Sequence, residues 1–128
     1  MINFHEPYVS KKQKKYLLDV TTTSTYLTDK YKNLCEEFLY DMYGEQILLT
    51  HSATAALEIS AKLIFLENQK QCKVSMPSYT FSSTANAFLI ENHKINFLDI
   101  NSEDMIVERN ALSKIKDYLV VVHYGNSC

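Results

Sequence analysis

Short apolar runs alternate with helix-periodic segments along most of this 128-residue chain. The runs of strand length are residues 46–50, 73–76, 94–100 and 118–123. The segments between them, 54–68, 81–91 and 110–116, are predicted as helices, because apolar residues recur in them at helical spacing. Parallel strands need crossover connections of this kind. The alternation therefore predicts an α/β fold, with a mostly parallel sheet, right-handed crossovers and helices on its faces.

The residues before this alternation form a separate N-terminal segment in our prediction, residues 1–30, followed by an α/β domain over 31–128. Lysines gather at Lys11, Lys12, Lys14 and Lys15, which we interpret as a solvated helix face rather than a phosphate-binding patch. The threonine-rich run 21–25 has no helical period and predicts strand or loop. A helix over 31–42 follows, and Gly44 is placed to end it in the left-handed conformation.

Composition excludes several classes of function. Only 2 of the 128 residues are glycine, so neither a G-x-G-x-x-G dinucleotide loop nor a Walker A loop can be built. A formal net charge of -2 gives no global case for nucleic-acid binding. The three cysteines have no C-x-x-C spacing and the four histidines are scattered, so we predict no metal site and a reducing, cytoplasmic location. The apolar runs are too short to span a bilayer.

Small polar and aromatic residues follow the predicted strands, where open parallel sheets bind their ligands. Ser52, Ala53 and Thr54 open a helix whose free N–H groups and hydroxyls form an anion site, with an ordinary Ser or Thr N-cap as the alternative. Tyr79 and Phe81 follow the next strand and either stack on a planar ligand or cover the core edge. Together these segments predict a site for a small, planar, phosphorylated cofactor.

Other polar residues after strands have simpler interpretations. Asp99 is expected to cap a turn. His123 has no carboxylate partner that the sequence identifies, and we interpret it as a packed, hydrogen-bonded side chain. Ser52 lacks a G-x-S-x-G context, so a nucleophilic triad has no support.

Specific motifs give the chain a family likeness. Residues 76–88 (MPSYTFSSTANAF), 48–58 (LLTHSATAALE), 97–99 (FLD) and 122–124 (VHY) resemble the sugar-nucleotide aminotransferases of the DegT/DnrJ/EryC1/StrS family. The resemblance implies the N-terminal part of the large domain of a type I pyridoxal-phosphate enzyme. It also implies a homodimer that moves an amino group from glutamate to a 4-keto-6-deoxy sugar nucleotide, for cell-surface polysaccharide such as O-antigen.

The resemblance also assigns roles to residues of this chain. It implies that Ser52, Ala53 and Thr54 bind the cofactor phosphate and that Phe81 stacks on the pyridine ring. The family's Schiff-base lysine and its pyridinium-pairing aspartate are expected beyond residue 128, so no catalytic residue is assigned. Residues 21–28 lack the glycine that the family usually has there. We expect an incomplete chain, inactive without a complementing C-terminal chain. The alternatives are a phosphate-ligand or interaction module and a fragment of a split gene.

Overall fold

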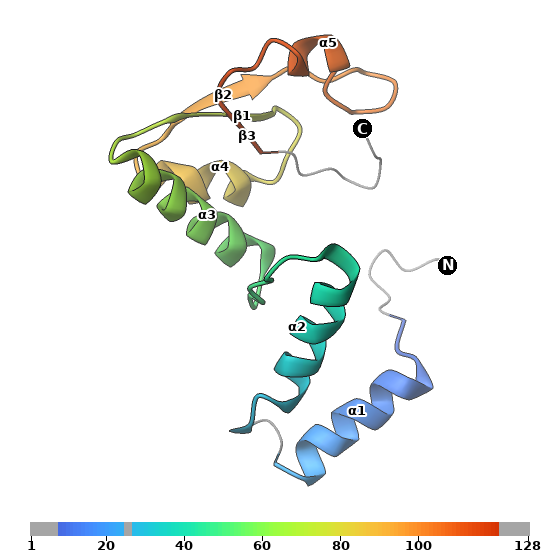
Figure 1. The fold of residues 1–128 in the computed structure, drawn as a ribbon. Coiled ribbons are helices and arrows are strands. Elements are labelled where there is room, and N and C mark those ends of the chain that lie inside the picture. The colour runs from blue at the N-terminus through green and yellow to red at the C-terminus, as the bar shows by residue number, and fades with distance from the viewer. Residues whose placement is uncertain (1–7, 25–26, 121–128) are drawn as a thin grey trace. The chain divides into compact units, whose positions relative to one another are not determined.

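The computed structural model describes residues 8–24 and 27–120, without the side chain of Arg109. Its contacts divide the chain between Leu49 and Thr50 into two compact units, each described by itself below. We call the described residues up to Leu49 the N-terminal unit and those from Thr50 the sheet unit (Figure 1). The domain boundary predicted after residue 30 falls inside the N-terminal unit.

The N-terminal unit begins with helix α1, Lys11–Thr22. A capping box starts it: Ser10 Oγ accepts from Gln13 N at 3.1 Å, and the Gln13 side chain accepts from Ser10 N. The helix continues through the first threonines of the run predicted as strand or loop, so that prediction is wrong for Thr21 and Thr22. Their hydroxyls donate to carbonyl oxygens one turn back, at Leu17 and Leu18, and so bond within the helix.

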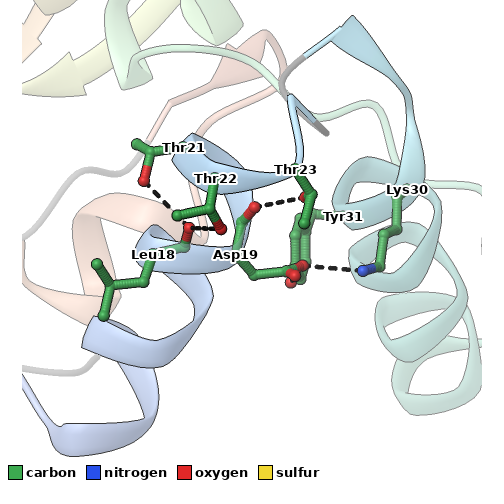
Figure 2. A network of polar contacts seen from close by, with 7 residues as sticks. All are labelled: Leu18, Asp19, Thr21, Thr22, Thr23, Lys30 and Tyr31. Carbon is green, nitrogen blue, oxygen red and sulfur yellow. Dashed lines mark hydrogen bonds and ion pairs between the residues drawn. The ribbon is translucent and has the colours of Figure 1, made fainter.

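Helix α2, Lys30–Tyr43, confirms the predicted helix, and Gly44 ends it with φ +71° as expected. Asp19 of α1 accepts hydrogen bonds from Lys30 Nζ at 2.9 Å and from the Tyr31 hydroxyl, which ties the two helices together (Figure 2). Neither helix contains a buried residue. The prediction of a strand over 46–50 is wrong, because this segment pairs with no described strand.

The sheet unit contains three parallel strands, which confirms the predicted fold class. They are β1, Lys73–Pro77, β2, Lys94–Leu98, and β3, Tyr118–Leu119, in the spatial order β2-β1-β3. The register pairs Val74 with Ile95 on one side and with Tyr118 on the other. The most buried strand, β1, therefore lies at the centre of the sheet.

Two helices pack along one face of this sheet (Figure 1). They are α3, Ala53–Asn68, and α4, Ser82–Leu89, both close to their predicted positions. Their small residues let them lie close to the strands. The buried core consists of Ala61, Val74, Met76, Ala85, Ala87 and Phe88. Phe88 is fully buried, whereas the neighbouring Leu89 is half exposed.

A buried histidine joins three segments of the sheet unit. His93 is 2% exposed, and its Nδ1 accepts from Cys72 N at 3.0 Å. Since Nδ1 accepts, Nε2 is the nitrogen that donates, to Ala61 O at 2.9 Å. The imidazole thus connects α3 to the chain entering β1 and β2.

The C-terminal part of the sheet unit differs most from prediction. β2 ends at Leu98, and Ile100 instead forms an isolated antiparallel bridge with Val107. Helix α5, Arg109–Leu112, is shorter than the helix predicted over 110–116. Leu119 of β3 is 40% exposed, so this strand is not buried on both faces. Residues 121–123 of that predicted strand lie outside the described part of the chain.

Candidate functional site

The carboxyl ends of β1 and β2 meet at one edge of the sheet. The backbone N–H of Ser78, just after β1, donates to Leu98 O at the end of β2 at 2.8 Å. This bond fixes the start of the loop that leads to α4. Phe81 at the end of that loop is the residue preceding α4, and its side chain is 65% exposed. Tyr79 is half exposed. An aromatic ring is therefore available at this edge.

The N-terminus of α3 has both the cap and the free donors that the sequence left as alternatives. Ser52 Oγ accepts from Ala55 N at 3.1 Å, and Ser52 O accepts from Ala56 N at 3.2 Å. Ser52 is thus an N-cap. Within the described residues, the N–H groups of Ala53 and Thr54 have no hydrogen-bond acceptor. These donors at the positive end of the helix dipole suit an anion.

One hydrogen bond connects the two helix starts. Thr54 Oγ1 donates to Ser83 Oγ at 3.3 Å, from the first turn of α3 to the first turn of α4. Because Ser83 is two residues beyond Phe81, this bond brings the free donors of α3 beside the segment that holds the exposed ring. Ser83 was not singled out from the sequence. Its only signal there was the hydroxyl-rich run 80–84.

The remaining candidate residues have structural roles or lie elsewhere. Asp99 Oδ1 accepts from Ile100 N at 3.0 Å, a bond to the next residue, and the nearest turn begins only at residue 102. Lys62 pairs with Glu91 at 3.1 Å, and Lys73, at the opposite end of β1, pairs with Asp117 at 3.5 Å. His123 is outside the described residues.

The residues at this edge fit a cofactor with a phosphate and a planar ring. The N–H groups of Ala53 and Thr54 suit the phosphate oxygens, and the side chains of Ala53 and Ala55 are too small to block them. The exposed Phe81 ring offers a stacking surface of the kind that an aromatic heterocycle uses. Every donor in this set is neutral, so a phosphate would be held by dipoles rather than by an ion pair.

No group of three or more His, Cys, Asp or Glu side chains is arranged in the described residues to hold a metal ion. None of the helices in the described ranges is long and apolar enough to cross a membrane.

The chain matches the family described as the DegT/DnrJ/EryC1/StrS aminotransferase family over residues 7–127. The matched range includes both helices of the N-terminal unit and the candidate site of the sheet unit.

Proposed function

Because the chain belongs to the DegT/DnrJ/EryC1/StrS aminotransferase family, whose members depend on pyridoxal phosphate, we propose that it binds this cofactor at the carboxyl edge of its sheet. When bound, pyridoxal phosphate supplies an electron sink for amino-group chemistry. The residues of this chain hold and orient it. Ala53 and Thr54 bind the phosphate through their N–H groups, Ser52 shapes the turn, and Phe81 stacks on the ring.

The observation that supports this proposal best is the hydrogen bond between Thr54 and Ser83. A phosphate cradle and a stacking ring serve one small cofactor only if they lie at the same edge of the sheet. The two residues come from different helices and are far apart in sequence, yet their hydroxyls are 3.3 Å apart. The bond supports a single site made of both helix starts.

The proposed substrate is a more specific claim than the cofactor. It rests on the resemblance of residues 76–88 and 48–58 to the sugar-nucleotide aminotransferases of the family. We propose transfer of an amino group from glutamate to a 4-keto-6-deoxy sugar nucleotide in the cytoplasm. The product class is dTDP-4-amino-4,6-dideoxygalactose, used for cell-surface polysaccharide such as O-antigen. None of the described residues that we assign to the cofactor edge, Ser52, Ala53, Thr54 and Phe81, is a lysine. We therefore propose that turnover uses groups from a second copy in a homodimer or from a complementing chain.

Titration with pyridoxal phosphate tests the cofactor site, monitored by absorbance and by quenching of tyrosine fluorescence. Phe81→Ala removes stacking of about 0.5–1.5 kcal/mol, which weakens binding about two- to tenfold. Thr54→Ser keeps the hydroxyl and should bind as the native chain does. Phe38→Ala, in the N-terminal unit, is the matched control. Unchanged affinity in Phe81→Ala would remove the ring from the site.

The transfer step has its own test. Glutamate and a dTDP-4-keto-6-deoxy sugar are incubated with the chain, with and without the C-terminal part of a family member, and 2-oxoglutarate and amino sugar are measured together. We expect both products in equal amounts only in the complemented mixture. Formation of 2-oxoglutarate without amino sugar would contradict the proposed acceptor.

A further inference from the structure

The Phe81 ring is positioned by its backbone more than by packing. The side chain is 65% exposed, so neighbouring side chains cover the smaller part of it. Phe81 also occupies the N-cap position of α4, where it makes no side-chain hydrogen bond to the helix. N-cap positions favour Ser, Thr, Asp and Asn, whose side chains bind the free N–H groups of the first turn. A phenylalanine gives up that stabilisation, and the direction of its ring follows from the backbone around it.

Thr84 binds the chain at Phe81 in two places. The Thr84 backbone N–H donates to Phe81 O at 2.9 Å. The Thr84 Oγ1 accepts from Thr80 Oγ1 at 3.1 Å. The first bond holds the carbonyl of Phe81, and the second holds the residue before it. Together they restrict the backbone torsions that set the direction of the ring.

Thr84 is itself fixed in the core of the sheet unit. It is 2% exposed and lies one turn before the fully buried Phe88, on the same face of α4. The other end of the loop is held by the bond from Ser78 N to Leu98 O. The loop 78–81 is therefore bound to β2 at its start and to Thr84 at its end. A buried hydroxyl is costly unless it is hydrogen-bonded, and this one has its partner beside the ring.

We propose that Thr84 is a positioning residue for the cofactor, which orders Phe81 for stacking before the cofactor arrives. A contact group that is already ordered binds more tightly. Ordering one side chain on binding costs about as much as a two- to tenfold change in affinity. The inference rests on the proposed function and adds to it a buried residue that acts only through Phe81.

Titration of the full chain with pyridoxal phosphate, followed by absorbance, tests this role. Thr84→Val keeps the shape and the backbone N–H but removes the Oγ1 acceptor, so it should weaken binding about two- to fivefold. Thr84→Ser keeps the hydroxyl and should bind as the native chain does. Thr80→Val removes the same bond from its half-buried donor and should match Thr84→Val, so the test does not depend on one variant folding. Thr22→Val, which removes a hydroxyl bond within α1, is the matched control.

Three further measurements separate positioning from a general structural role. Thr84→Val should add nothing to the loss in Phe81→Ala, because the hydroxyl acts through the ring. Inorganic phosphate needs only the N–H groups of α3, so both single variants should bind it as the native chain does. In the cofactor-free chain, the NMR order parameter of the Phe81 amide should fall in Thr84→Val and stay unchanged in Thr84→Ser.

Native affinity for pyridoxal phosphate in Thr84→Val would overturn the inference. So would an equal loss of affinity with and without the Phe81 ring, or weaker binding of inorganic phosphate, because either would show a general loss of structure. The same titrations separate this inference from the proposed function. A weakened Phe81→Ala beside a native Thr84→Val removes only the role of Thr84, whereas a native Phe81→Ala removes the ring from the site and this inference with it.

Discussion

The two units of this chain are stabilised in different ways. The sheet unit buries Val74, Met76 and Phe88 completely and places a hydrogen-bonded histidine beside them. The N-terminal unit has no buried residue in either helix and is connected by polar contacts at Asp19 and by a ring contact between Tyr16 and Tyr31 at 5.6 Å. Burial of apolar side chains stabilises the sheet unit, whereas helix caps and contacts between exposed side chains stabilise the N-terminal unit.

The sharpest test of this difference compares two phenylalanines. Phe88→Ala should destabilise the sheet unit by about 3–5 kcal/mol, because it opens a cavity in the core. Phe38→Ala, measured at a dilution where the chain is monomeric, should change stability by less than about 0.5 kcal/mol, because the ring is already 64% exposed. Urea unfolding followed by circular dichroism measures both. Equal losses would show that burial does not distinguish the units.

The buried histidine should have the next largest effect. His93→Ala removes the acceptor of Cys72 N and the side-chain bond to Ala61 O, and it leaves a cavity where the imidazole was buried. We expect a cost of about 2–4 kcal/mol in the free energy of unfolding. The exposed His51→Ala provides the control, with an expected change below about 0.5 kcal/mol. Amide hydrogen exchange at Cys72 gives a local readout. Protection that survives the loss of the imidazole would contradict its bridging role.

A smaller effect is expected at the start of α1. Ser10→Ala removes the capping box and should cost about 1 kcal/mol, seen as lost helix signal at low temperature. Ser60→Ala, inside α3, is the control, since alanine is the better helix former there. A larger loss in Ser60→Ala than in Ser10→Ala would show that caps do not sustain the N-terminal unit.

The smallest effect concerns Asp19, because its partners are exposed. The Tyr31 hydroxyl and, secondarily, the Lys30 ammonium donate to this carboxylate and hold its pKa below the ordinary value of 3.8. The same contact raises the pKa of Tyr31. Since the folded pKa is the lower one, the contact stabilises the hairpin above pH 3.8 and is lost as pH falls through the folded value.

NMR titration of the Asp19 carboxyl checks this sign, together with the cross-peaks between the Tyr16 and Tyr31 rings. Asp19→Asn should weaken the cross-peaks at neutral pH and abolish their loss in acid. Asp41→Asn, on the far half of α2, should leave them unchanged. Titration of Asp19 at or above its ordinary value would exclude the link between the helices.

Local patterns predicted the elements whose cause is local. Gly44 ends α2 because a left-handed residue is needed there, and α3 begins at the Ser52 cap that the sequence suggested. The apolar run 46–50 has strand composition but no neighbouring strand, and a strand exists only in a sheet. Thr21 and Thr22 lack a helical pattern, yet their hydroxyls bond one turn back. Neither the missing strand at 46–50 nor the continuation of the helix through Thr21 and Thr22 follows from local residue types alone.

The candidate site also combines features that local sequence predicts with one that depends on tertiary packing. The helix start at Ser52–Thr54 and the ring at Phe81 were predicted from residue types that follow strands. The contact between Thr54 and Ser83 depends on how α3 packs against α4, which no short segment specifies. Whether these residues bind a cofactor stays a prediction, and the titrations above decide it.

The strand order β2-β1-β3 has a consequence for the order in which the chain folds. Val74 finds Ile95 after a single helix crossover, whereas its pairing with Tyr118 must also close the loop through α5. Closing the longer loop costs more entropy, and this pairing returns only a two-residue strand. We therefore expect β1, α4 and β2 to form the folding nucleus, with α3 docking on it through Phe88. β3 should join last and protect its amides least during refolding.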